Sequence, residues 1–233
     1  MLLKNKTISL MQPTYIPWLG YFNLIKKADE FILLTSTQLS KRSWQTRNRI
    51  KTKNGTLMLT IPIKKTGTRE KTLIKNAEVM NELSWQENHL KSIKHSYSKS
   101  PFFDQIYPSI FNILSKKSSF LIDYSIPLIE FFIEKLDIKT KVIVSDQISY
   151  TGLKDEALVS ICKKRNANCY LSVEGSKDYI LSGENLFDKN NIKLVWNTYN
   201  HPNYKQLHDS FISHLSIIDS LFMLGFEQVK KLI

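Results

Sequence analysis

The chain has 233 residues, of which 42% are hydrophobic and 11% aromatic, and it carries a formal net charge of +12. This is enough apolar material for a sizeable core, but the longest apolar runs, such as Phe31–Leu34, are far too short to cross a bilayer. The N-terminus lacks the apolar stretch of a secretory signal, so we expect a cytoplasmic protein. Cys162 and Cys169 are then reduced thiols, and because their spacing matches no common zinc pattern we expect no metal site.

The first elements predict a strand, a turn, a helix and a second strand. Ile8–Met11 is a short apolar run, Pro13 and Pro17 bracket a turn, and Phe31–Leu34 is a second apolar run after a helix that begins near Gly20. Open α/β sheets bind ligands where a strand is followed by a loop and a helix N-terminus. The alternative is a βαβ unit that binds nothing.

The positive charge is concentrated in the first part of the chain. Residues 1–100 hold 18 Lys and Arg against 6 Asp and Glu, and no acid occurs between Phe31 and Arg69. Arginine forks match the geometry of phosphate or carboxylate, and an indole can stack on a base or a sugar. This pattern indicates an anion-binding segment, although a solvated basic face is the alternative. The segment consists of Lys41, Arg42, Trp44, Arg47, Asn48, Arg49, Lys51 and Lys53.

The middle of the chain predicts a hairpin followed by helices. Asn54-Gly55 indicates a tight turn before a strand over Leu57–Ile63, and Leu73–Val79 is a candidate short strand. Trp85–Tyr97 has the spacing of an amphipathic helix with His89 on its apolar stripe. His89 is therefore either a packed histidine or a catalytic base. Two further helices are expected over residues 102–116 and 119–136.

The second half returns to alternating strands and helices. Strands are expected at Lys141–Ser145, Cys169–Ser172 and Ile192–Trp196, and a closing helix at Leu215–Gly225, with the glycine as its C-cap. The expected fold class is α/β: a Rossmann-like, mainly parallel sheet flanked by helices, with a helical insertion in the middle of the chain. We expect one domain over residues 1–233, within which residues 84–137 could form a helical subdomain.

Five ordered segments carry a family resemblance. MQPTYIPWLGYFNLIKKADEF, KRSWQTRNRIK, YLSVEGSKDYI, HPNYKQ and FISHLSIIDSLFMLG resemble, in order and spacing, the WbqC-like family. The resemblance implies a role in the biosynthesis of bacterial O-antigen or another surface polysaccharide, and transfer of a glycyl or similar aminoacyl group to an amino sugar. The chain departs from the family at Thr35 and Ser36, where members often carry acids, and at Val173, where they carry glycine.

A transferase of this kind would join an acyl group to the amine of a nucleotide-linked sugar. It needs a positive cradle for the diphosphate, a stacking surface, a base for the attacking amine and donors for an oxyanion. No tightly bound cofactor is expected; the activated acyl donor would be an aminoacyl-tRNA, an aminoacyl carrier, or ATP plus an amino acid. The candidate catalytic residues are His89, Lys177 and His201. The candidate substrate-binding residues are Gln12, Tyr15, Trp18, Gly20, Tyr21, Lys41, Arg42, Trp44, Arg47, Asn48, Arg49 and Tyr179.

One of these expectations concerns geometry across the two halves of the chain. If the Cys169–Ser172 strand is parallel to the Ile8 strand, the loop after it lies at the same sheet edge as Gln12. We then expect the Lys177 ammonium within about 10 Å of Gln12 or Tyr15. The alternative is an ordinary surface loop with a solvated Lys177.

Two other classes of function stay open. Trp18-Leu19-Gly20-Tyr21 lies where adenylate-forming ligases and nucleotidyltransferases carry a His-x-Gly-His signature, but Trp18 and Tyr21 cannot supply the charge of two histidines. An ATP-dependent ligase would use Lys41 and the Lys64–Lys71 loop on the phosphates and would release pyrophosphate. A non-enzymatic protein would use the basic half to hold nucleic acid or an anionic membrane surface, with a steep salt dependence.

Overall fold

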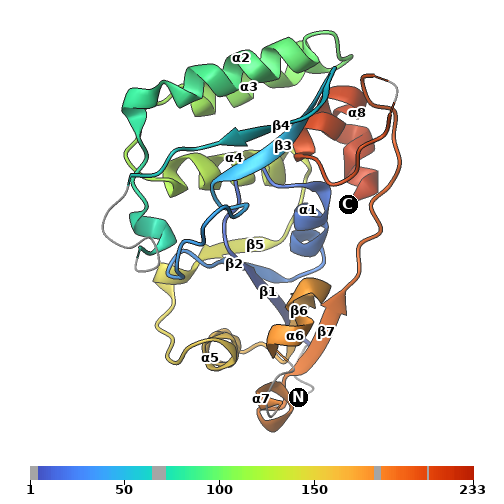
Figure 1. The fold of residues 1–233 in the computed structure, drawn as a ribbon. Helices are drawn as coiled ribbons and strands as arrows, with labels where there is room; N and C mark the ends of the chain where they lie inside the picture. The colour runs from blue at the N-terminus through green and yellow to red at the C-terminus, as the bar shows by residue number, and fades with distance from the viewer. Residues whose placement is uncertain (1–4, 65–71, 181–184, 209) are drawn as a thin grey trace. The chain divides into compact units, whose positions relative to one another are not determined.

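The computed structural model describes residues 5–64, 72–180, 185–208 and 210–233, without the side chains of Asp178 and Tyr179 (Figure 1). The chain divides into two compact units, each made of three separate stretches. The sheet unit contains Met1–Gln12, Asn23–Thr35 and Lys139–Asn200. The hairpin unit contains Pro13–Phe22, Ser36–Ile138 and His201–Ile233.

The sheet unit is built on five parallel strands in the order β5-β2-β1-β6-β7. This confirms the Rossmann-like expectation, including the adjacency of the first two strands. Taken in chain order, the strands lie 3-2-1-4-5, the arrangement of doubly wound sheets, and the order reverses between β1 and β6. The strands are β1 (Thr7–Met11), β2 (Glu30–Leu33), β5 (Lys141–Val144), β6 (Cys169–Val173) and β7 (Lys193–Asn197).

Apolar side chains from the strands and from helix α5 (Asp155–Lys164) form the core of this unit. Ile8 and Ile32 are fully buried in it, and so are Ile161 and Cys162 of α5. The short helix α7 (Leu186–Lys189) adds Phe187, whose ring stacks on Tyr170 at 5.2 Å between centroids. Cys162 and Cys169 are free thiols, one on a helix face and one at a strand start, as predicted.

An ion-pair cluster lies at the amino end of β2. The Glu30 carboxylate accepts hydrogen bonds of 2.8 Å from both Nε and Nη2 of Arg165 and lies 3.0 Å from Lys6 Nζ. The hydrogen bonds from Arg165, aided by Lys6, outweigh burial and hold the pKa of Glu30 at about 2. This cluster ties the chain just before β1 and the residue after α5 to β2.

The hairpin unit contains an antiparallel hairpin and the predicted helices. Strands β3 (Arg47–Thr52) and β4 (Gly55–Thr60) pair from Arg47 with Thr60 to Thr52 with Gly55, joined by the two residues Lys53 and Asn54. Helix α2 (Trp85–Tyr97) has the predicted bounds, with every fourth residue from Trp85 to Tyr97 buried. The other long helices are α3 (Phe103–Leu114), α4 (Ile122–Lys135) and α8 (Ile217–Leu232).

One secondary-structure expectation was wrong, because Leu73–Val79 contains a 3-10 turn, η2 (Ile74–Asn76), and isolated bridges in place of a strand. At Gly225 the backbone of α8 is non-helical, with a φ of 72°, as expected of a helix end, but a second helical stretch follows and continues to Leu232. A Cβ on Gly225 would lie 2.8 Å from the ring of Phe102, so the glycine serves close packing as well as a left-handed backbone.

Helix α1 (Leu19–Lys26) begins in the hairpin unit and ends in the sheet unit. A short 3-10 turn, η5 (Glu174–Ser176), and helix α6 (Lys177–Ile180) follow β6. Within the described part of the chain, no helix combines the length and the apolar character needed to cross a membrane.

Candidate functional site

The Pro13–Pro17 turn of the hairpin unit is held by Asn48 of β3. The Asn48 side-chain amide donates to the main-chain carbonyls of Tyr15 at 3.1 Å and Ile16 at 2.7 Å. Ile16 has a φ of 42°, which a β-branched residue adopts only when its surroundings enforce it. Asn48 was predicted to bind substrate; its amide is engaged instead in fixing this turn, and a direct role toward substrate stays a prediction.

His89 lies in the core of the same unit. Its Nδ1 is 2.9 Å from the Tyr15 hydroxyl, and its ring packs against the edge of Trp85. The His89 side chain is buried, and burial lowers its pKa to about 4, although a hydrogen bond to the Thr60 main chain opposes this. Tyr15 is fully buried, and burial raises its pKa. These two predicted site residues are neighbours, but neither is open to solvent.

Trp18 and Gly20 form a tight contact at the start of α1. A Cβ on Gly20 would lie 2.2–2.6 Å from three carbons of the Trp18 indole, so only glycine leaves room for this ring. Gly20 was predicted to bind substrate; the group that it accommodates in the structure is the Trp18 indole. Tyr21, also a predicted binding residue, is buried in the core with its ring against Phe22.

An aromatic group, which we call the His201 cluster, consists of Trp18, His201, Tyr204, Phe211 and His214. The His201 ring is nearly parallel to the Trp18 indole, with 6.2 Å between centroids and 8° between planes. His214 lies 4.9 Å from both of these rings, and Tyr204 and Phe211 lie about 6 Å from His201. Phe211 and His214 are exposed, so two rings of the cluster are open to solvent, each tilted against His201.

His201 is held in one protonation pattern. Its Nδ1 lies 3.0 Å from the Pro202 carbonyl, and because a carbonyl can only accept, Nδ1 carries the hydrogen. Burial and the neighbouring His214 lower the pKa of His201, which leaves it neutral near pH 7. A neutral imidazole of this tautomer has its lone pair on Nε2, as a general base requires, but Nε2 is buried in this structure, so a substrate reaches it only when the surrounding rings move.

Arg49 of β3 borders this cluster. Its Nη2 donates to the His214 carbonyl at 3.2 Å, and its main-chain carbonyl accepts from Ser216 N at 2.9 Å. The guanidinium carbon lies 5.7 Å from the centroid of the Trp44 ring, and Trp44 is 48% exposed. Arg49 Nε is buried without a hydrogen-bond partner.

The other basic candidates lie on the same unit. Arg47 alternates with Arg49 along β3, so both project from one face of the strand, as predicted. Arg42 and Arg47 line a small pocket of about 130 Å³, and Arg47 Nε is also buried without a partner. Lys41 is exposed beside Arg42, whose φ is 52°. Residues 65–71 of the loop expected over the phosphates lie outside the described residues.

Gln12, Lys177 and Tyr179 belong to the sheet unit. Because β1 and β6 are parallel neighbours, Gln12 and the η5–α6 segment follow these strands at the same carboxyl edge. Lys177 Nζ pairs with Glu174 Oε1 at 3.1 Å and lies 5.6 Å from the centroid of the Trp196 ring. The side chain of Tyr179 is outside the described part. The predicted proximity of Lys177 to Gln12 or Tyr15 stays a prediction.

At the same edge, the carboxyl ends of β2 and β5 share a polar network that sequence reasoning missed. Thr35 Oγ1 donates to Asp146 Oδ2 at 3.0 Å, and Thr35 N donates to Ser145 Oγ at 3.0 Å. The acid that is absent at Thr35 and Ser36 is thus supplied by the neighbouring strand end. His214 was also missed, although it lies in the quoted segment FISHL. Among the described residues, no three or more His, Cys, Asp or Glu side chains are grouped as metal ligands.

Comparison with known proteins supports the resemblance of the five segments. The model of the WbqC-like protein family matches residues 12–231. The uncharacterized protein Rv1507c of Mycobacterium tuberculosis (strain ATCC 25618 / H37Rv) is 31% identical over 224 residues, which cover 95% of each chain. No solved structure matches the chain.

Proposed function

The chain belongs to the WbqC-like protein family, and from this membership and the His201 cluster we propose that it is an acyl transferase of surface polysaccharide biosynthesis. Family membership suggests a role related to polysaccharide biosynthesis. Our finer proposal is that a glycyl or similar aminoacyl group is joined to the amine of a nucleotide-linked amino sugar in the cytoplasm. The observation that carries it is a neutral, tautomer-fixed His201 inside an aromatic wall that Arg49 borders.

The chemistry follows from the state of His201. The substrate ammonium releases one proton to solvent, and the free amine attacks the carbonyl carbon of the activated acyl group while Nε2 of His201 takes a second proton from the attacking nitrogen. A carbon–nitrogen bond forms, the bond to the oxygen or sulfur of the carrier breaks, and the imidazolium returns its proton to that leaving group. The Arg49 guanidinium supplies positive charge for the oxyanion or for the diphosphate.

The nucleotide portion of the substrate would lie along the basic strand. Trp44 offers an exposed ring for stacking on the base or the sugar. Arg47 and Arg49 are only partly buried, and the terminal nitrogens of their guanidinium groups would bind the diphosphate. Because His89 is buried and hydrogen-bonded to Tyr15, we propose His201 and not His89 as the base.

The decisive experiment is mass spectrometry of the surface polysaccharide from cells with and without the gene. A missing acyl mass in the deletion strain, restored by the wild-type gene but not by His201→Gln, is the expected result. Lys116→Gln, an exposed change after α3, serves as the matched control and should restore the mass. An unchanged polysaccharide in the deletion strain, or full restoration by His201→Gln, would overturn the proposal.

A ligase that makes its own aminoacyl adenylate is the second candidate, because the 3-2-1-4-5 strand order is typical of nucleotide-binding folds. It predicts release of pyrophosphate when purified protein receives ATP, an amino acid and a nucleotide-linked amino sugar. The transferase predicts product from a preformed aminoacyl donor without ATP.

A further inference from the structure

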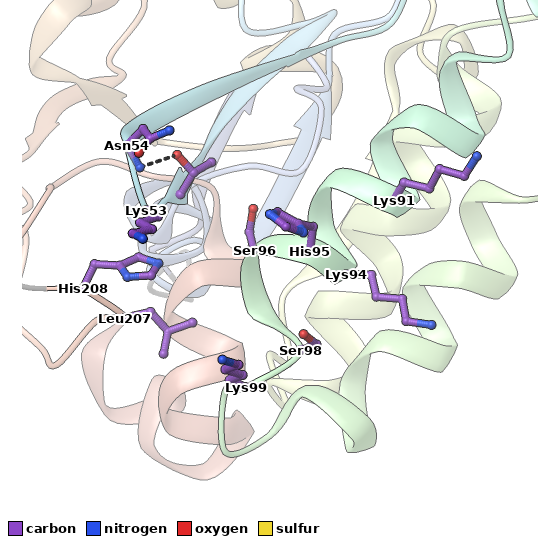
Figure 2. A pocket seen from close by; sticks show the side chains of 11 residues that line it. Lys53, Asn54, Lys91, Lys94, His95, Ser96, Ser98, Lys99, Leu207 and His208 are labelled. Atoms are coloured by element: carbon purple, nitrogen blue, oxygen red, sulfur yellow. Dashed lines mark hydrogen bonds between the residues drawn. The ribbon is translucent and has the colours of Figure 1, made fainter.

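The hairpin unit holds a second basic feature, away from the residues assigned above. A concave pocket of about 930 Å³ is lined by six cationic or titratable side chains and by no carboxylate (Figure 2). Lys53 comes from the hairpin tip, and His208 from the segment before α8. The remaining four lie on or just after α2: Lys91, Lys94, His95 and Lys99.

Most of these charges have no acidic partner within the described part of the chain. Among the described residues, no carboxylate pairs with Lys53, Lys94 or Lys99, and Lys91 has only an exposed pair with Glu87 at 2.7 Å. Lys94 and His95 lie in the last turn of α2, where cations favour the helix dipole. The dipole of α2 does not account for Lys53 or His208, because these residues come from other segments.

One buried lysine makes hydrogen bonds to several segments that line the pocket. Lys51 is 2% exposed, and its main-chain N donates to the Tyr97 hydroxyl of α2 at 2.8 Å. Its Nζ donates to Gln206 Oε1 at 3.2 Å, to the His208 carbonyl at 3.3 Å and to the Ser210 carbonyl. The hairpin, α2 and the His208 segment are therefore fixed to one another, so the hollow that they line is preformed, and Figure 2 shows Lys91 and Lys94 at its outer side, pointing away from Lys53 and His208.

The lining identifies the kind of ligand. It contains lysines and histidines but no arginine and no aromatic ring other than the imidazoles, so it offers charge without a bidentate fork or a stacking surface for a base. The row from Lys91 to the end of α2 at Tyr97 rises about 9 Å, longer than one phosphate group. A concave surface also fits a rounded chain better than a flat membrane. We propose that this pocket binds the phosphate backbone of a polynucleotide.

This proposal does not depend on the transferase activity, because none of its residues belongs to the His201 cluster or to the basic strand face of Arg47 and Arg49. Should both proposals hold, an aminoacyl-tRNA would be the natural acyl donor.

The test is binding of fluorescently labelled bulk transfer RNA, followed by anisotropy between about 0.05 and 0.3 M salt. The pocket variant is Lys94→Gln with Lys99→Gln, and the matched control is Lys116→Gln with Lys231→Gln, which removes the same charge from exposed positions of the same unit. The pocket variant should lose about tenfold or more in affinity near 0.1 M salt, and its slope of log affinity against log salt should fall by about 2. The control should change little.

Four outcomes would overturn the proposal or count against it. The wild type binds no transfer RNA, or both double variants lose affinity equally, so that net charge alone matters. In the third outcome, inorganic tripolyphosphate binds the wild type but not the pocket variant, while the two proteins bind RNA with the same affinity. The pocket would then be a site for small anions only. Lys53→Gln, from a different wall, should reproduce part of the loss if the pocket acts as one surface, and no loss would also count against the proposal. Thermal unfolding of each variant confirms that it is folded.

Discussion

The side-chain amide of Asn48 lies 2.7 Å from the main-chain carbonyl of Ile16, the residue whose φ is 42°. Asn48→Ala removes this bond and the one to Tyr15, and leaves two buried carbonyls without donors. We expect the free energy of unfolding to fall by about 2–4 kcal/mol, since each bond contributes about 1–2 kcal/mol. Urea titration measures this, with Asn112→Ala on the exposed side of α3 as the control. Equal stability of wild type and Asn48→Ala would contradict the role of Asn48 in the turn.

Gly20→Ala should displace the Trp18 indole, because the new methyl group would lie 2.2 Å from a ring carbon. Overpacking of this kind costs about 1–3 kcal/mol. Gly175→Ala is the matched control, since nothing lies within 4 Å of its Cβ position. The double change Gly20→Ala with Trp18→Leu should recover part of the loss. No recovery would mean that the indole is not the group that Gly20 accommodates.

Arg47→Ala should weaken affinity for a nucleotide-linked sugar by about 1.5–3 kcal/mol, the range for hydrogen bonds to charged groups. Arg49→Ala should have a similar effect and should also free the Trp44 ring. Isothermal calorimetry on folded variants measures both, with Lys116→Ala as the control. Unchanged affinity in both arginine variants would indicate that Arg47 and Arg49 form an ordinary solvated face.

The proposed base makes a prediction about pH. Burial and His214 lower the pKa of His201 below its ordinary value of 6.5, and only the neutral form accepts a proton. Transferase activity should therefore be full at pH 7 and fall on acidification, with a midpoint below 6.5. His201→Gln should reduce kcat by about 10²-fold or more and remove this acid limb from the residual rate. Persistence of the same limb in the variant would assign it to another group.

The Glu30 cluster makes a prediction about stability. The folded pKa of Glu30 is about 2 against an ordinary 4.5, so its contribution is present above pH 4.5 and is lost as the pH falls from 4.5 through 2. The shift corresponds to about 3 kcal/mol at neutral pH. Glu30→Gln should lose that stability at pH 7 and should show a flatter stability profile between about pH 5 and 2. Parallel profiles for the two proteins would contradict this account.

Local patterns predicted the elements better than their ends. The strands of the parallel sheet were visible as short apolar runs, and the stripe from Trp85 to Tyr97 gave α2 its bounds. Two prolines, Pro108 and Pro127, lie inside α3 and α4, although proline favours the first turn of a helix. Each costs one main-chain hydrogen bond, and the buried faces of these helices outweigh that cost.

The candidate site was only partly predictable, because its partners are far apart in the chain. The turn around Trp18 and the HPNYKQ segment were both singled out, but nothing local indicates that His201 stacks on Trp18. The basic segment also proved to be mixed in role. Arg49 borders the aromatic cluster, whereas Lys51 of the same run is buried and holds the Gln206–Ser210 segment. Composition cannot distinguish the role of Arg49 from that of Lys51, because the difference lies in which distant segment packs against each side chain.

The division of each unit into three stretches has a consequence for synthesis on the ribosome. Strands β1 and β2 emerge early, but β5 joins the edge of the sheet only after the whole Ser36–Ile138 stretch has been made, and β6 reaches β1 later still. The hairpin unit likewise waits for His201–Ile233, which is made after the other stretches of both units. No single cut in the gene therefore separates the two units, and a nascent chain that stalls in the middle exposes both edges of β1–β2 to other chains.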